Sequence, residues 1–416
     1  MSFAMWEPVM LDAEVSTALI NPGNSNITPG LNKIEQILTI LDNPQYKYQV
    51  IHITGTNGKG STAAFIEAGL IHAGKSVGKY TSPYIKSINE TIVLNHNPIS
   101  DDDLNYHFWH LQPLLNINQI KLSPFELLTA IMFTYFAKHN IEYLVLEVGL
   151  GGQDDATNVV NSVISIITNI GLEHTNYLGN TLEDIASAKA GIIKNGYTII
   201  ADNNPELIAA VKARTSNYVN VLDKYQYLIK LDSGKFHTQL QLFGEGCDYD
   251  LSLFGHFQAK NFLCAFEALQ KLGINKDSIK FAAENTRHPG RLELRERDPL
   301  IVFDATHNAD GAKSLVESLS GLYRRDEVVI ITSILGDKNQ LQMLNLLSNL
   351  ANNIICTEIK DNPRSSKAED LAAIATLFFE NVKVIPNPLN ALELARTLSK
   401  KLILVTGSLY LLSYFS

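Results

Sequence analysis

Cysteine is scarce in this sequence, and long uninterrupted apolar runs are absent from it. Three cysteines occur among 416 residues, and no two of them form a Cys-x-x-Cys pair. We therefore expect neither a disulfide framework nor a zinc ribbon, and a reducing compartment suits this composition better. No uncharged apolar stretch approaches the roughly 20 residues that a membrane-spanning helix needs, so we expect no membrane partner.

A basic surplus and a basic amino-terminal leader are missing as well. Lys and Arg total 34 against 43 Asp and Glu, which gives a formal net charge of −9. This balance argues against a nucleic-acid coat, which needs a basic face, so no nucleic-acid partner is expected. Met1–Val15 carries acids where a signal peptide has a basic segment and an apolar run, which predicts a cytoplasmic protein.

The composition is that of a globular protein with a large core. Apolar residues make up 45% of the chain and charged residues 19%. This excludes a disordered, collagenous or coiled-coil chain, and the length predicts two or three domains.

Strand-like and helix-like segments alternate through the first half of the chain. Apolar, β-branched runs predict strands at 49–54, 141–148 and 162–168, and helical spacing predicts helices at 61–73 and 123–139. Such alternation implies a mostly parallel sheet covered on both faces.

The pattern changes to a period of two at 225–254, which predicts a small antiparallel section. The charged segment Arg287–Pro299 indicates a linker or domain edge. Five apolar runs with helical patterns between them then predict a smaller, doubly wound domain: 300–303, 328–331, 353–356, 382–385 and 401–405.

We therefore predict an α/β protein of two domains, 1–296 and 297–416, with a ligand cleft between them. The first has a mostly parallel sheet plus the small antiparallel section, and because a glycine-rich loop with Lys59 follows its strand at 49–54, we expect a P-loop-type ATPase domain. The second is a smaller, Rossmann-like carboxyl-terminal α/β domain.

A glycine-rich loop follows the predicted strand at 49–54 and opens a helix. Its backbone N–H groups can point at one anion, the helix N-terminus adds positive potential, and Lys59 supplies a full charge. The strict G-x-x-x-x-G-K-[ST] pattern is not met, because Gly60 separates Lys59 from Ser61. The alternative is a plain turn with a solvated lysine. The strand–loop–helix context favours a phosphate site made by Thr56, Asn57, Gly58, Lys59, Gly60 and Ser61.

A carboxylate stands near the end of the buried strand predicted at 141–148. Glu147 lies where α/β sheets bind ligands, and an apolar strand rarely ends in an acid without a partner there. Hard oxygen ligands suit Mg²⁺, which keeps several waters and contacts ATP oxygens. The alternative is a surface acid or a helix cap.

The loop sequence GTNGKGS at Gly55–Ser61 resembles the nucleotide loop of the Mur ligase superfamily. The extra glycine after the lysine is the form typical of its folylpolyglutamate synthase/dihydrofolate synthase branch. Further motifs follow in the same order as far as Leu412. The resemblance implies ATP as the nucleotide and roles for individual residues.

The resemblance also implies a metal centre. The expected ligands of two Mg²⁺ ions are Ser61, Ser82, Glu147, His174 and Lys189. Ser82 matches the second hydroxyl residue of an (S/T)SP loop, which without the family would be a plain Ser-Pro turn. His174 matches the histidine of an (L/I)DHT segment, although Glu173 stands where Asp is usual.

Lys189 matches the lysine of the family's (E)KAGI motif, which carries a carbamate in known relatives. Here Ala188 stands where Glu is usual. Without the family, Lys189 would be a solvated lysine interacting with a helix dipole. A carbamylated Lys189 is thus a hypothesis from resemblance, and the expected catalytic residues are Lys59, Glu147, His174 and Lys189.

Other segments resemble the family's substrate motifs. Asp155, in QDDATN, matches the pterin-contacting aspartate of R-(L/W/F)-D-A-T-N, although Gln153 replaces the arginine and Asp154 replaces a large apolar residue. Ser123 and Phe125 match a segment that borders the pterin. Ser123 with Glu three residues later also predicts a helix capping box. Ser408, in a GSLY segment, is a candidate for the glutamate substrate.

Four residues match nucleotide-contacting motifs. Asn261 matches an adenine-contacting asparagine, and otherwise would be an Asn on a helix face. Arg291 lies in a Pro-Gly-Arg motif whose arginine reaches ATP phosphate, a role that suits its planar, permanent charge. Asp304 matches the residue on the nucleotide ribose, with His307 nearby, although Ala309 replaces the usual Pro.

The resemblance implies an ATP-dependent ligase that adds L-glutamate to dihydropteroate and to reduced folylpolyglutamates through an acyl phosphate. We expect a bifunctional enzyme that acts as a monomer on small molecules. A monofunctional folylpolyglutamate synthase or another Mur-type amino-acid ligase is the alternative within this class. A nucleotide-dependent switch or transport ATPase is the alternative from another class.

Overall fold

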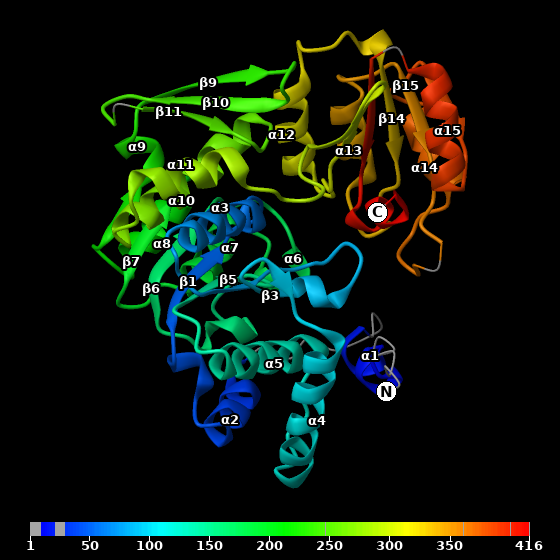
Figure 1. Cartoon of the computed structure of the whole chain (residues 1–416). Coiled ribbons are helices and arrows are strands. Elements are labelled where there is room, and N and C mark those ends of the chain that lie inside the picture. The colour runs from blue at the N-terminus through cyan, green and yellow to red at the C-terminus, as the bar shows by residue number, and fades with distance from the viewer. Residues whose placement is uncertain (1–9, 21–29, 246, 361, 400, 416) are drawn as a thin grey trace, which may run out of the picture. The chain divides into compact units, whose positions relative to one another are not determined.

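The computed structural model describes residues 10–20, 30–245, 247–360, 362–399 and 401–415. The chain divides into two compact units (Figure 1). The first comprises Met1–Asn220 with Glu267–Ser278, and the second comprises Val221–Phe266 with Ile279–Ser416. The domain boundary expected between 296 and 297 stays a prediction.

An eight-stranded sheet forms the centre of the first unit, in the order β4-β3-β2-β5-β1-β6-β7-β8. Its strands are β1 (Gln49–Thr54), β2 (Val77–Tyr80), β3 (Ile92–Leu94), β4 (Asn97–Pro98), β5 (Tyr143–Glu147), β6 (Ser162–Ile167), β7 (Tyr197–Ile200) and β8 (Tyr218–Asn220). The strands from β2 to β8 in this order run parallel, while β3 and β4 continue the sheet antiparallel. The carboxyl ends of β2, β5, β1 and β6 therefore meet at one edge.

Helices cover both faces of this sheet (Figure 1). They are α1 (Ala13–Ile20), α2 (Asn32–Ile40), α3 (Lys59–His72), α4 (Asp101–Ile117), α5 (Pro124–Lys138), α6 (Thr175–Leu178), α7 (Leu182–Ala190) and α8 (Pro205–Lys212), with short 3₁₀ helices η1 (Pro44–Tyr46), η2 (Ile88–Thr91) and η3 (Ala156–Val159). On one face, α1, α2, α4 and α5 share a core with Val50, Leu144 and Leu146. Since side chains alternate along a strand, their neighbours face α3.

The second unit contains two sheets. The smaller one is antiparallel, in the order β11-β10-β9, and it confirms the antiparallel section expected at 225–254. The larger one has the order β12-β13-β17-β14-β15-β16 and is parallel from β13 onward. The strands are β9 (Tyr227–Asp232), β10 (His237–Leu242), β11 (Cys247–Leu251), β12 (Glu293–Arg297), β13 (Leu300–Phe303), β14 (Val328–Thr332), β15 (Asn353–Cys356), β16 (Asn381–Val384) and β17 (Leu402–Thr406).

Alternate residues of the larger sheet bury into two separate cores, so the doubly wound arrangement is confirmed. Val302, Ile330 and Leu404 pack with α12, α13 and α14, whereas Ile331 and Val405 pack with α15 and α16. The helices are α9 (Val221–Lys224), α10 (His256–Lys271), α11 (Lys276–Asn285), α12 (Ala309–Leu319), α13 (Gln340–Leu347), α14 (Ala368–Ala375), α15 (Pro388–Leu398) and α16 (Leu409–Leu412), with η4 (Arg325–Glu327) and η5 (Ser413–Phe415).

The segment Arg287–Pro299, expected to be a linker or domain edge, contains strand β12. This strand pairs antiparallel with β13 at the edge of the sheet. An edge strand tolerates charges that a central strand does not, and here Glu296 forms a two-pronged ion pair with Arg396 at 2.7 and 2.9 Å. Because β12 is rich in charged residues, the sequence pattern did not predict a strand there.

No helix among the described residues is both long and apolar enough to cross a membrane.

Candidate active site

The carboxyl edge of the first sheet collects the residues that the sequence singled out in this unit. The phosphate loop follows β1, Ser82 follows β2, Glu147 ends β5, and His174 follows β6. A small pocket at this edge is lined by Lys59, His174 and Lys189 together with Gly149–Gly151. Residues far apart in sequence thus meet where parallel strands end, which is the usual ligand position in open α/β sheets.

The phosphate loop is held in a tight curl. Gly58 caps α3 with a φ of +88°, a conformation that side chains rarely adopt. The Lys59 ammonium donates to the Gly55 carbonyl oxygen at 2.9 Å and lies 3.9 Å from the Glu147 carboxylate. The loop therefore presents a lysine beside an acid whose side chain is only 6% exposed.

Two residues that sequence reasoning missed brace this loop from the end of β6. The Thr168 hydroxyl donates to the Asn57 carbonyl at 2.6 Å, and the Asn57 amide donates to the Asn169 side chain at 2.9 Å. A Cβ at Gly55 would lie 1.8 Å from the Thr168 oxygen, so only glycine fits there. Their signal was position, since Thr168 ends the buried strand predicted at 162–168 and Asn169 follows it directly.

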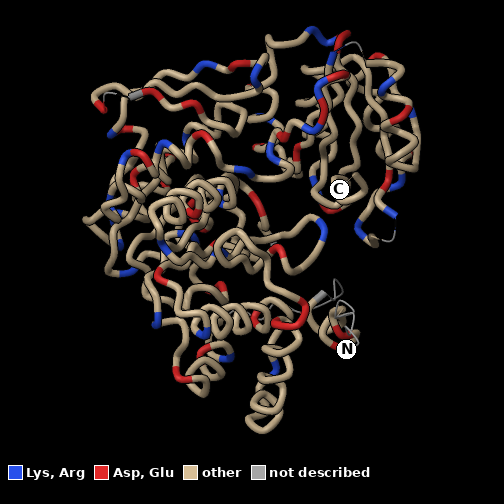
Figure 2. The backbone as a smooth tube through the Cα atoms, viewed as in Figure 1, with Lys and Arg blue, Asp and Glu red and all other residues tan. Residues whose placement is uncertain are grey.

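Lys189 is buried at the end of α7, with 4% of its surface exposed. Burial, and next the charge of Lys59, lower its pKa from 10.5 to about 7, although Glu173 opposes this. Figure 2 shows acidic and basic residues interspersed along both units. The pocket itself is lined by groups of both signs, with Glu173 as well as Lys59 and Lys189.

His174 adopts a left-handed backbone conformation with a φ of +54°, and its ring lies 3.7 Å from the Glu173 carboxylate. The described residues contain no group of three or more His, Cys, Asp and Glu side chains that could hold a metal ion by themselves.

The predicted substrate residues lie beside this pocket. Phe125 packs over Gly149, where a Cβ would come within 2.4 Å of the ring. Ser123 forms the predicted capping box, in which the Glu126 amide donates to its hydroxyl at 3.3 Å and the Glu126 carboxylate accepts from its amide at 2.7 Å. Asp155 is buried, with 6% of its surface exposed, and burial raises its pKa.

The four residues that match nucleotide-contacting motifs outside the phosphate loop lie in the second unit, as does Ser408. Both carboxylate oxygens of Asp304 accept backbone amides, from Leu292 and Thr306, each at 2.9 Å. These bonds tie the Arg291 turn to the carboxyl end of β13. The Gly407 amide donates to the Thr306 carbonyl at 3.1 Å, which brings Ser408 to the same edge.

His307 and Asn261 complete this group. His307 lies three residues beyond Asp304, with its Nδ1 atom 3.0 Å from the Ala305 carbonyl. Asn261 is buried on α10, where its amide donates to the Gln258 side chain at 2.9 Å. The predicted site residues are therefore divided between the two units.

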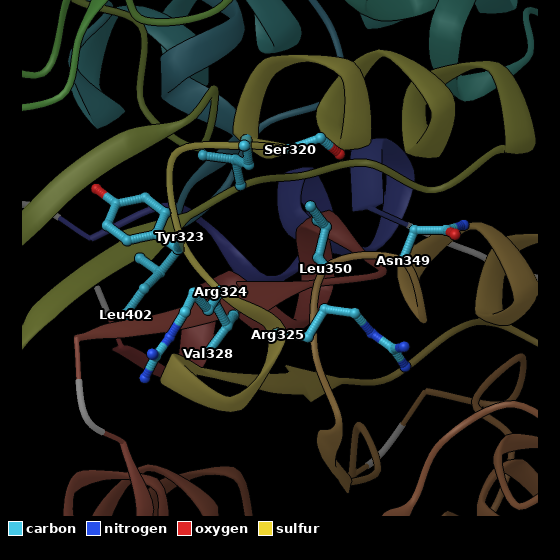
Figure 3. A pocket seen from close by; sticks show the side chains of 10 residues that line it. Ser320, Tyr323, Arg324, Arg325, Val328, Asn349, Leu350 and Leu402 are labelled. Atoms are coloured by element: carbon cyan, nitrogen blue, oxygen red, sulfur yellow. The ribbon is translucent and has the colours of Figure 1, made fainter.

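A separate cavity of about 250 Å³ opens at the amino ends of β14 and β17 (Figure 3). Figure 3 shows Arg324 and Arg325 extending in different directions at its rim. Arg324 forms an ion pair with Asp326, with its Nε atom 3.2 Å from Oδ1. None of the predicted site residues lines this cavity.

Comparisons with known proteins agree with this architecture. Residues 53–269 match the Mur ligase middle domain, and residues 290–409 match the Mur ligase glutamate ligase domain. Among curated proteins, the chain is 33% identical to the dihydrofolate synthase/folylpolyglutamate synthase of Bacillus subtilis, over 93% of this chain and 94% of that protein. It is 32% identical to the folylpolyglutamate synthase of Lacticaseibacillus casei, covering 80% and 82%.

Solved structures give the same answer. The folylpolyglutamate synthase of Mycobacterium tuberculosis complexed with ADP and AMPPCP superposes with a TM-score of 0.85 at 30% identity, covering 92% of this chain and 94% of that one. The enzyme of Thermotoga maritima has a TM-score of 0.82 at 32% identity, covering 93% and 92%. The chain therefore belongs to the dihydrofolate synthase/folylpolyglutamate synthase family of the Mur ligase superfamily.

Proposed function

We propose that this chain is an ATP-dependent ligase that joins L-glutamate to dihydropteroate and to reduced folylpolyglutamates. The observation that carries the proposal is the pocket at the carboxyl edge of the first sheet. There a phosphate loop with Lys59, the acid Glu147 and the buried amine of Lys189 meet. The relatives' names supply the substrate class.

The reaction needs activation, because a carboxylate has no good leaving group. An acceptor carboxylate oxygen attacks the γ-phosphorus of ATP, the bond to ADP breaks, and an acyl phosphate forms. The amine of L-glutamate then attacks the acyl carbon, phosphate leaves, and the amine loses a proton. The chain needs no nucleophile of its own. Lys59 offsets charge on the transferred group, and the loop amides hold the phosphates in line.

The donor set suits Mg²⁺. Glu147 offers a buried carboxylate, Ser61 lies in the first turn of α3, and Ser82 follows β2 at the same edge. Because Mg²⁺ binds through one or two carboxylates plus phosphates and waters, the lack of a three-residue cluster among the described side chains is compatible with it. We propose two ions, with His174 and Lys189 serving the second. When bound, they neutralise phosphate charge.

We also propose that CO₂ carbamylates Lys189. A carbamate forms when an uncharged amine attacks CO₂ and loses a proton, and a pKa of about 7 leaves a substantial fraction of this amine uncharged near neutrality. The product is an anion that can ligate a cation. Carbon NMR with isotope-labelled CO₂ tests this, and a signal that Lys189→Met fails to remove contradicts it.

The proposed roles of the remaining site residues rest on their match to the family's motifs. Asn261, Arg291, Asp304 and His307 would contact ATP, and Ser408 would contact L-glutamate. Ser123, Phe125 and Asp155 would border the pterin. We further propose a domain boundary between 296 and 297, a cytoplasmic location and action as a monomer.

ADP release tests the proposal. ADP should appear only when ATP, L-glutamate and a pteroate or folate acceptor are all present, and turnover that ignores both substrates would indicate a switch or transport ATPase instead. Dihydropteroate and tetrahydrofolate should be assayed side by side, since a negligible rate with dihydropteroate leaves a monofunctional folylpolyglutamate synthase.

The contribution of Lys59 can be isolated with a matched pair of variants. Lys59→Met should abolish ADP release, whereas Lys33→Met, which removes an exposed lysine on α2, should leave it unchanged. Equal rates of ADP release in the two variants would show that Lys59 is not needed for the reaction.

A further inference from the structure

A buried chain of hydrogen bonds runs from the centre of the first sheet to Asp155. His52 lies in the middle of β1 with none of its surface exposed, and its Nε2 atom is 2.9 Å from the Thr157 hydroxyl oxygen. Thr157, also fully buried, donates that hydroxyl to the Asp155 Oδ1 atom at 2.5 Å.

The direction of each bond follows from the chemistry of the groups. An ionised carboxylate only accepts hydrogen bonds, so the Thr157 proton points at Asp155. The Thr157 oxygen must then accept from His52, which places the ring hydrogen on Nε2. The Nδ1 atom of His52, which in this tautomer is an acceptor, is buried without a hydrogen-bond partner.

His52 is an uncharged hydrogen-bond donor near neutral pH. Burial, with a contribution from the charge of Lys194, lowers its pKa to about 3. The ring therefore keeps one fixed hydrogen near neutral pH and does not act as a pH switch.

The far end of the chain holds the pocket wall. Asp155 Oδ2 accepts the Leu150 amide at 2.8 Å, while Oδ1 also accepts the Thr157 amide at 3.0 Å. Leu150 lies between Gly149 and Gly151, and all three line the pocket that contains Lys59 and Lys189. The bond from the Leu150 amide thus couples the Asp155 carboxylate to this wall.

We propose that His52 is a positioning residue for the ligase reaction, acting through Thr157 and Asp155 on the 149–151 wall. The inference rests on the proposed function. A threonine hydroxyl can rotate, and in isolation it can donate elsewhere. The donor of His52 occupies one lone pair of the Thr157 oxygen, which disfavours a hydroxyl proton pointing at β1 and favours the orientation that sends it to Asp155. His52 touches no reacting atom and works by locking this rotor.

The test uses isosteric pairs. Thr157→Val removes the hydroxyl at constant shape, and Thr157→Ser keeps it. His52→Gln keeps a nitrogen donor near the Nε2 position, and His52→Leu removes it. Thr198→Val is the matched control, because Thr198 is also fully buried in a strand of this sheet and its hydroxyl has no hydrogen-bond partner.

Two readouts are measured on the full chain: steady-state kinetics and hydrogen exchange at the Leu150 amide. A hydrogen bond to a charged group contributes enough that Thr157→Val should lower kcat about tenfold to a hundredfold. The KM for ATP should stay constant, because the phosphate loop is untouched. Exchange at Leu150 should accelerate. Thr157→Ser and His52→Gln should restore most of kcat, and His52→Leu combined with Thr157→Val should be no worse than Thr157→Val alone.

The proposal is overturned if Thr157→Val has the same steady-state kinetics and the same hydrogen-exchange rate at the Leu150 amide as Thr198→Val. If Thr157→Val does not fold, the His52→Gln and His52→Leu pair decides, and equal kcat values for the two overturn it. If the unmodified protein releases no ADP, the proposed function fails. The exchange data then still test the hydrogen-bond chain separately. If exchange at the Leu150 amide is unchanged in Thr157→Val, the chain does not hold the wall.

Discussion

Replacing Lys189 with methionine should stabilise the protein while abolishing its activity. Methionine is close to lysine in length and carries no charge. In the folded chain, burial holds the pKa of Lys189 at about 7, against 10.5 for an ordinary lysine. Folding near neutral pH therefore requires the amine to lose a proton that the unfolded chain keeps.

The magnitude follows from the pKa difference. One pKa unit corresponds to about 1.4 kcal/mol, so the lysine costs on the order of 4 kcal/mol of folding free energy at about pH 7. The unfolded state binds more protons between about pH 7 and 10.5, so stability rises with pH in this window. By about pH 9.5 the cost should fall to about 1.5 kcal/mol.

Urea unfolding at several pH values measures this effect, in buffer without CO₂ or divalent metal so that no carbamate changes the charge. Lys189→Met should exceed the unmodified protein in stability near pH 7, and the gap should narrow as pH rises. Lys212→Met, an exposed lysine at the end of α8, serves as the control with an expected change within about 0.5 kcal/mol. A gap that does not vary with pH would refute the assignment of a buried, neutral amine.

Three further substitutions test other parts of the structure. Gly55→Ala should abolish ATP binding measured by calorimetry, because its Cβ would overlap Thr168, whereas Gly74→Ala, which meets nothing within 4 Å, should cost only about 1 kcal/mol in thermal unfolding. Ser123→Ala should lose about 0.5–2 kcal/mol in urea unfolding through the missing helix cap, and unchanged stability would contradict the capping box. The pKa of His52 is lowered from 6.5 to about 3, so its contribution to stability is lost as pH falls through this window. Near pH 4.5 this loss amounts to about 2–3 kcal/mol of unfolding free energy, and His52→Gln should remove it. Parallel acid-unfolding curves for the two proteins would argue against a buried neutral ring.

Local patterns predicted the elements well where periodicity was strong. The strand expected at 49–54 is β1 with the same bounds, and the helix expected at 123–139 is α5, flanked by its predicted cap. The strand β12 escaped prediction, because an edge strand pays no burial penalty for its charges and so lacks the apolar signature of a strand.

The candidate site shows the same division. The phosphate loop was visible in sequence, because glycines and a lysine between a strand and a helix are a local requirement of anion binding. Thr168 and Asn169 were not recognised, since their partners at Asn57 lie more than 100 residues away and only the sheet order brings β6 beside β1.

The sequence by itself determined the class of chemistry, the family and the residue types that carry charge. Only the tertiary structure decided the environment of those residues. Lys189 has the same side chain wherever it stands, but burial near Lys59 makes it a weak base. Likewise, His52 and Thr157 are 105 residues apart in sequence, and only the packing of η3 against β1 lets Thr157 connect His52 to Asp155. Burial and long-range pairing are properties of the packed chain, which is why local sequence patterns cannot contain them.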